Sequence, residues 1–196
     1  MTSPATRYCG KRALWAVLLC GIFGVHLAAA APAENTGFAV VRAGTHLSDE
    51  VYHLDAQLRY KFHPVVLEAL DSGVPITLEM QIQVVHPRSW MWNEVVYGLS
   101  QRYRIQYHAL TRQYLVINLN NGVKSSYSSL GTALDAVGTV KNLPILDRRL
   151  LRVGEHYQAR LRTLLVVGAL PSPLRIWAYF SKDWHQESDW YTWSLQ

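Results

Sequence analysis

A strict alternation of apolar and polar side chains constrains the fold of this chain more than any other feature of its sequence. Between residues 52 and 62, apolar or aromatic side chains occupy every second position, and polar ones fill the positions between them. Side chains of a β-strand point alternately to opposite faces, so this pattern predicts a strand with one buried face and one solvated face. The apolar positions are Tyr52, Leu54, Ala56, Leu58, Tyr60 and Phe62.

Similar short runs recur along the rest of the chain. The Asn-Gly pair at 121–122 favours a tight hairpin turn, so the runs on either side of it should pair with each other. The clean alternation argues against a parallel sheet, because strands in such sheets are buried on both faces. Further strands are predicted over residues 76–84, 103–107, 114–119, 123–127 and 157–165, and two last short runs cover 174–180 and 190–195.

Two short helices are predicted between these strands. Pro64 suits the first position of a helix, and Gly73 suits the position just past its end. The second helix follows a serine cap, Ser128 or Ser129, and its apolar residues recur at helical spacing. The predicted fold class is therefore all-β, mainly β with two short helices. It is an antiparallel β-sandwich, immunoglobulin-like or open barrel-like, preceded by an N-terminal signal helix.

The first 30 residues differ in character from the rest. Basic residues come first, an apolar run follows, and a row of alanines closes the segment. This three-part pattern is typical of a secretory signal peptide, with cleavage best placed after Ala30. The alternative is an uncleaved anchor, because residues 13–31 are just long enough to span a membrane. The basic residues are Arg7, Lys11 and Arg12, and the apolar run covers 13–27.

The domain organisation follows from this segment. Residues 1–30 are the signal peptide or anchor, residues 31–37 a linker, and residues 38–196 a single β-rich domain. We expect the domain to lie in the periplasm, either released or anchored to the inner membrane by residues 13–31 and facing the periplasm.

Removing the first segment changes the charge and cysteine content. Three of the 19 basic residues and none of the 14 acidic residues lie within 1–30, so the formal net charge falls from +5 to +2. A nucleic-acid partner is not expected, because no strong uniform basic field remains. Both cysteines, Cys9 and Cys20, lie in the removed segment. Disulfides, a thiolate nucleophile and a cysteine metal site are therefore excluded from the predicted mature domain.

No common catalytic or cofactor motif occurs in the sequence. We therefore predict no catalytic residue, no cofactor and no metal site, and favour a protein that is not an enzyme. One segment deserves weighing, because in an extended chain Asp183, His185, Glu187 and Asp189 would share a face and could hold a divalent ion. A polar connection between the last two strands is the favoured interpretation.

Two aromatic residues and two arginines are the candidate partner-binding residues. Trp90 and Trp92 share a face at period two, where the strand pattern gives way to irregular sequence. Arg102 and Arg104 lie on the polar face of their predicted strand, as Arg160 and Arg162 do on theirs. If those strands are neighbours, the arginines form a basic plate that can meet carboxylates or phosphates. Recognition by an exposed strand edge is the other mode that stays open.

Two further hypotheses use the C-terminal residues. Trp184, Trp190 and Trp193 could stack on sugar rings of cell-wall glycans if they formed an exposed row. An envelope hydrolase would need Asp183, His185 or Glu187 to converge on a pocket with another acid, and the sequence offers no such partner.

The order of these segments resembles an exported proteobacterial family known as domain of unknown function 4390. The resemblance covers roughly residues 38–195, and the family has no assigned activity or site residues to carry over. The resemblance implies an exported envelope protein. Members of the family are often encoded beside a membrane sensor kinase and its response regulator, which implies envelope signalling and an envelope or inner-membrane protein partner. The segments that carry it are 70–78 (LDSGVPITL), 88–92 (RSWMW), 103–114 (YRIQYHALTRQY), 129–134 (SLGTAL), 170–175 (LPSPLR) and a Trp-rich C-terminus.

Overall fold

The computed structural model describes residues 37–88, 90 and 92–195, which belong to one compact unit, Asn35–Gln196. The predicted signal helix and most of the predicted linker lie outside the described residues. Within the described ranges, no helix is long and apolar enough to cross a membrane.

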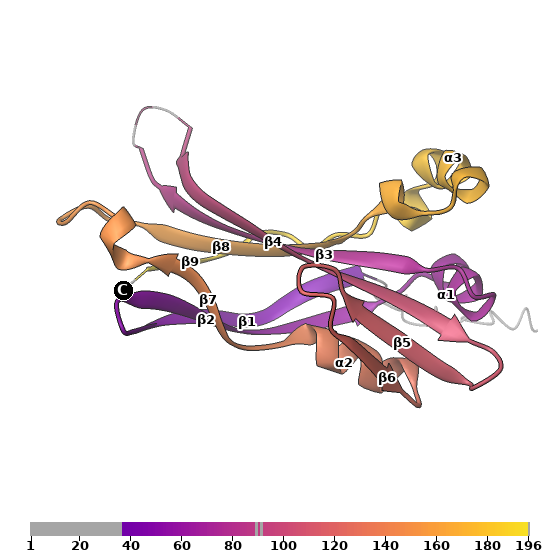
Figure 1. Ribbon diagram of the computed structural model, residues 1–196. Coiled ribbons are helices and arrows are strands. Elements are labelled where there is room, and N and C mark those ends of the chain that lie inside the picture. The colour runs from indigo at the N-terminus through magenta and orange to yellow at the C-terminus, as the bar shows by residue number, and fades with distance from the viewer. Residues whose placement is uncertain (1–36, 89, 91, 196) are drawn as a thin grey trace, which may run out of the picture. The chain divides into compact units, whose positions relative to one another are not determined.

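The described residues form nine strands in two antiparallel sheets, which confirms the predicted β-sandwich (Figure 1). The smaller sheet has the order β1-β2-β7, and the larger has the order β6-β5-β4-β3-β8-β9. The strands of the smaller sheet are β1 (Gly37–Ser48), β2 (Val51–Lys61) and β7 (Thr139–Asp147). Those of the larger sheet are β3 (Ile76–His86), β4 (Glu94–His108), β5 (Gln113–Asn118), β6 (Lys124–Tyr127), β8 (Gln158–Leu165) and β9 (Tyr191–Ser194).

Both predicted helices are present. In α1 (Pro64–Asp71), Pro64 begins the helix, and Gly73 follows its end with a φ of 84° that favours glycine. In α2 (Leu130–Gly138), the Ser129 hydroxyl caps the helix by accepting a hydrogen bond from the backbone N–H of Thr132 at 3.2 Å. Three 3₁₀ turns are also described, η1 (Arg148–Leu150), η2 (Val167–Ala169) and η3 (Lys182–Trp184).

A third helix, α3 (Ser172–Phe180), was not predicted. Residues 174–180 were expected to be one of the last two short strand-like runs. The apolar residues of α3 instead follow a helical spacing of three and four, from Pro173 through Ile176 and Trp177 to Phe180. A proline in the first turn suits this start, because its missing N–H has no helical partner there.

The core lies between the inner faces of the sheets. The alternate residues that predicted β2 are buried, and β3 contributes Ile76, Leu78 and Met80 to the same core. Helix α2 packs its last turn directly on β2. A Cβ added at Gly138 would lie 2.5 Å from the backbone oxygen of Leu58, so this approach requires glycine.

Strands β1 and β7 were not predicted, because the alternation of apolar and polar residues is interrupted in each of them. The register of β1 against β2 shifts between Val40 and Arg42, which leaves Val41 unpaired as in a β-bulge. Strand β7 shifts register twice against β2, and Asn142 within it has a positive φ of 50°. Such irregularities change which face the following side chains occupy, so the sequence of these strands does not alternate strictly.

Both sides of the sandwich carry a link between the sheets. On one side, the indole N–H of Trp193 in β9 donates to the hydroxyl of Thr45 in β1 at 3.1 Å. On the other side, α2 follows β6 of the larger sheet, precedes β7 of the smaller one and contacts both. The outermost strand of each sheet is therefore close to an element that links it to the other sheet.

Candidate functional site

The outer face of the larger sheet gathers most of the polar side chains of its central strands. Because the even-numbered residues of β3 from Ile76 to Val84 fill the core, Glu79, Gln81 and Gln83 point to the outer face. The register places Glu79 opposite Arg102 of β4, and Gln81 opposite Arg162 of β8.

The two arginine pairs are therefore on one face. The basic plate was expected if β4 and β8 were neighbouring strands. They are not neighbours, but they flank β3 from either side. Arg102 and Arg104 lie on one flank, and Arg160 and Arg162 lie on the other. The polar residues of β3 stand between the two pairs and bond to three of the four arginines.

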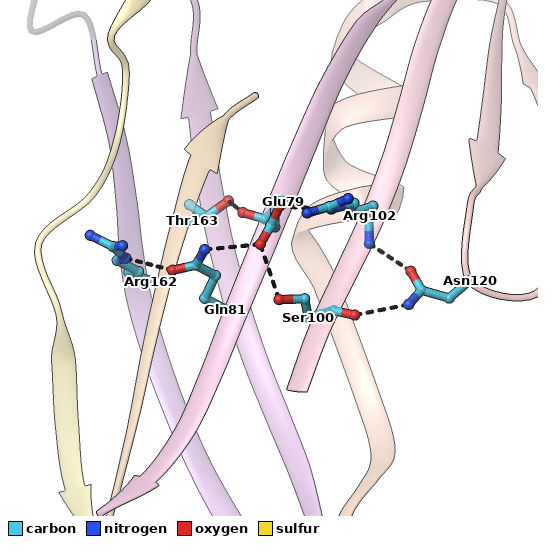
Figure 2. Close-up of polar contacts among 7 residues, drawn as sticks. All are labelled: Glu79, Gln81, Ser100, Arg102, Asn120, Arg162 and Thr163. Carbon is cyan, nitrogen blue, oxygen red and sulfur yellow. Dashed lines mark hydrogen bonds and ion pairs between the residues drawn. The ribbon is translucent and has the colours of Figure 1, made fainter. Parts of the chain in front are cut away.

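Glu79 is the centre of this network (Figure 2). Its side chain is only 6% exposed although it lies on the outer face. One carboxylate oxygen accepts from the Gln81 amide at 2.9 Å and from the Ser100 hydroxyl at 3.0 Å, and the other accepts from Arg102 Nε at 2.7 Å. Three donors from two strands thus satisfy one buried carboxylate.

These donors favour the ionised form of the Glu79 carboxyl. Burial alone would raise the pKa of this carboxyl, since low-dielectric surroundings disfavour the charged form. The hydrogen bonds from Gln81, Arg102 and Ser100, together with the Arg102 charge, outweigh burial and hold the pKa below its ordinary value. Glu79 is therefore a fixed anion suited to holding neighbouring strands in register.

Asn120 extends the network to the turn after β5 (Figure 2). Its side-chain oxygen accepts from the backbone N–H of Arg102 at 2.7 Å, and its amide donates to the backbone oxygen of Ser100 at 2.8 Å. The side chain continues the hydrogen bonding of β4 past the end of its pairing with β5. The Asn-Gly turn that predicted the hairpin therefore also fixes the backbone beside Glu79.

The β8 side of the face is also fully engaged. Arg162 Nε donates to the Gln81 side chain at 2.9 Å, and its Nη1 lies 3.4 Å from Glu187. Arg160 donates two hydrogen bonds to Gln83, at 2.9 and 2.6 Å. Both guanidinium groups also lie over the Trp190 ring, 4.5 and 4.7 Å from its centroid.

The candidate partner-binding residues lie in different surroundings. Trp90 and Trp92 belong to the connection between β3 and β4 rather than to a strand, so period two does not govern them. They are 96% and 92% exposed. Arg102 is held by Glu79, whereas the Arg104 side chain has no hydrogen-bond or ion-pair partner among the described residues.

The three C-terminal tryptophans do not form an exposed row. Trp184 is only 4% exposed and belongs to the core. Trp193 is half-buried and bonded to Thr45, and the half-buried Trp190 lies against two arginines. The bulk of Trp184 is used to fill the interior, so it offers no face on which a sugar could stack.

The acidic segment after α3 is not extended as its metal-binding interpretation required. Residues 182–184 form the turn η3, so the acidic side chains do not alternate regularly. Asp183 lies 3.5 Å from His63, whereas Glu187 meets Arg162. No group of three metal-ligating side chains occurs in the part of the chain that the structure describes.

Comparison with known proteins places this domain in a family. A protein-family model described as "Domain of unknown function (DUF4390)" matches residues 35–194. The chain belongs to the DUF4390 family. The match spans both sheets of the sandwich, in agreement with the resemblance seen in the sequence. Searches of curated proteins and of solved structures each found no match.

Two features of this DUF4390 domain escaped sequence reasoning. Glu79 stands at an ordinary polar position of an alternating strand, and only the register reveals its three donors. Helix α3 exposes an apolar face of Pro173, Ile176, Trp177 and Phe180, with Trp177 78% exposed. The i, i+3, i+4, i+7 spacing of these residues is the signal that could have found it.

Proposed function

We propose that this DUF4390 protein is exported to the periplasm and acts there as a non-enzymatic binding module for an envelope protein. Trp90, Trp92, Arg102 and Arg104 form the docking surface, which we name the Trp90–Arg104 surface. Export is supported by the basic start, apolar run and alanine row of the first 30 residues.

The exposure of Trp90 and Trp92 carries the proposal. The hairpin that joins β3 to β4 rises from the larger sheet on the side away from the smaller sheet (Figure 1). It holds two almost fully solvated indoles. Two indoles this exposed bury little surface within the fold, and tryptophan is among the residues most enriched where binding energy concentrates in interfaces.

The adjoining strand supplies charge. Strand β4 begins at Glu94, two residues after Trp92, and carries Arg102 and Arg104 along its outer face. The Arg104 guanidinium is free to meet a carboxylate of the partner, and Arg102 is about half exposed beside Glu79. Arg102 and Arg104 lie eight and ten residues along β4 from Glu94, which is roughly 27 and 34 Å at about 3.4 Å per residue. A partner that spans this length, with an apolar pocket for the indoles at one end and acidic side chains at the other, fits the surface.

In-cell crosslinking tests the proposal. A C-terminally tagged chain would be crosslinked in the envelope, purified, and its partner identified by mass spectrometry. The sensor kinase suggested by the family resemblance is the first candidate to look for. We expect one dominant envelope protein, with crosslinks mapping to residues 88–104.

Variants make the test specific. The double variant Trp90→Ser/Trp92→Ser should reduce capture about tenfold or more, because loss of central aromatic anchors typically weakens binding by this much. Trp177→Ser is the matched control, since this tryptophan is also exposed but lies on α3. Equal capture by wild type and the double variant, or equal loss in the control, would overturn the proposal.

A further inference from the structure

A second site lies at the end of the sandwich where β1 turns into β2. There, the turn, η1 and the connection from η1 to β8 enclose an open cavity of about 530 Å³. Three arginines line it, Arg148, Arg149 and Arg152, together with Glu50 and Glu155. The cavity shares no residue with the Trp90–Arg104 surface, so this inference does not depend on the proposed function.

The three arginines of the cavity differ in what their side chains contact. The Arg148 guanidinium lies 3.8 Å from Glu50, a loose and exposed pair. Glu155 faces His86, with 3.0 Å between its Oε2 and the imidazole Nε2. In the part of the chain that the structure describes, the guanidinium groups of Arg149 and Arg152 have no partner. The cavity therefore offers an incoming anion two guanidinium groups whose hydrogen-bond donors are unused, although the carboxylates of Glu50, Glu155 and Asp147 keep its net charge small.

The local backbone holds these arginines in place. The sequence of residues 148–152 predicts a solvated turn. The structure shows a 3₁₀ turn at Arg148–Leu150, in which the Asp147 side chain accepts from the N–H of Arg149 at 2.8 Å. The backbone N–H of Arg152 donates to the Tyr157 hydroxyl at 3.2 Å. Two side-chain bonds thus fix the turn that carries the guanidinium groups.

Tyr157 supplies the cavity with a hydrogen-bond donor and with part of an apolar wall. Because the Tyr157 oxygen accepts from Arg152, its own O–H proton is available to donate. The Tyr157 ring is buried and packs against the His86 ring at 5.4 Å. Leu151 and Leu195 complete the wall. The cavity thus combines two guanidinium groups and one hydroxyl, which can donate hydrogen bonds, with an apolar surface beside them.

We propose that this cavity binds a phosphate-bearing anion through Arg149, Arg152 and the Tyr157 hydroxyl. Guanidinium groups match the oxygens of a phosphate in paired hydrogen bonds, which makes arginine the preferred residue for this recognition. The apolar wall accommodates the organic part of a phosphate ester. Free phosphate and the phosphate of a lipid headgroup share this chemistry, and the test separates them.

Titration calorimetry with the mature domain provides the first arm, with inorganic phosphate as the probe. Sedimentation with phosphatidylcholine vesicles, with and without phosphatidylglycerol, provides the second arm. The variant Arg149→Ala/Arg152→Ala should weaken binding about tenfold or more in whichever arm responds, because it removes both unpaired guanidinium groups. Arg59→Ala is the matched control, because this exposed arginine of β2 also has no side-chain partner among the described residues and lies outside the cavity.

Each outcome decides the proposal. Binding of inorganic phosphate that the double variant loses and the control keeps supports a soluble phosphate ligand. Binding only to vesicles that contain phosphatidylglycerol, again lost in the double variant alone, supports a headgroup site. No binding in either arm, or binding that the double variant retains, overturns the proposal. Thermal melting of each variant verifies that the domain is folded.

Discussion

The arginines of the outer sheet face and those of the end cavity differ in what they touch. On the sheet face, Arg102 bonds to Glu79, and Arg162 bonds to Gln81, Glu187 and the ring of Trp190. At the cavity, Arg149 and Arg152 have no side-chain partner among the described residues. Arginine side chains thus hold strands together on the sheet face, whereas at the cavity their hydrogen-bond donors are unused.

The difference teaches how to interpret arginine clusters in this domain. The predicted basic plate exists as a set of four arginines on one face, yet three of them already bond to β3. Their removal should cost stability more than binding. The cavity arginines contribute little to the fold, so their removal should cost binding more than stability. The predictions below test this contrast, starting with the largest expected effect.

Glu79→Ala should destabilise the domain by about 2–3 kcal/mol, because it leaves three donors without their buried acceptor. Urea unfolding of the wild type and the variant measures this difference. Glu187→Ala is the control, since that carboxylate is 61% exposed and meets Arg162 at 3.4 Å. Its loss should change stability by no more than about 0.5 kcal/mol. Equal effects of the two substitutions would contradict the central role of Glu79.

The stability contributed by Glu79 should depend on pH. Its folded-state pKa lies below the ordinary value of 4.5, so the ionised group stabilises the folded state. This contribution is fully present above the unfolded-state pKa and is lost as the pH falls through the folded-state pKa. The gap in urea midpoint between the wild type and Glu79→Gln should therefore be largest near neutral pH and shrink in acid. A gap that stays constant down to about pH 3 would rule this linkage out.

Trp190→Ala should lower stability by about 1 kcal/mol, because two guanidinium groups lose the ring face over which they lie. Chemical unfolding again provides the measurement. Tyr191→Ala serves as the comparison, since this neighbouring aromatic residue in β9 is more exposed and has no guanidinium over it. A larger loss for Tyr191→Ala would show that the arginine–tryptophan stack does not stabilise this edge of the sheet.

Arg149→Ala/Arg152→Ala should leave stability within about 0.5 kcal/mol of the wild type, as for most surface substitutions without partners. The melting temperature should shift correspondingly little. A pronounced drop in melting temperature would mean that these arginines have a structural role after all, and the contrast between the two clusters would fail.

The sequence predicted the regular parts of this fold and missed the irregular ones. Strand β2 keeps strict alternation, and the Ser129 cap and Asn-Gly turn act through their nearest neighbours, so each could be inferred locally. Strand β1 was missed because its bulge at Val41 breaks the period. Helix α3 was missed because short apolar runs fit helix and strand equally well unless the spacing is counted.

The candidate sites show the same limit. Arg102 and Arg104 could be placed on one face from alternation alone. The bond between Arg102 and Glu79 depends on which strands pair and in which register, and that is set by contacts distant in the sequence. Residues from position 50 to position 195 line the end cavity, so no local sequence pattern could reveal it.

The links between the two sheets bear on how this domain behaves at high concentration. A bare sheet edge presents unpaired N–H and C=O groups that can recruit a strand of another molecule, which is a common route to aggregation. Here, the Trp193–Thr45 bond ties β9 to β1, and α2 stands between β6 and β7. The two edge strands of the larger sheet are also only four residues long. Such short edges make poor templates for another chain, so the larger sheet should resist edge-to-edge association between copies of this domain at high concentration.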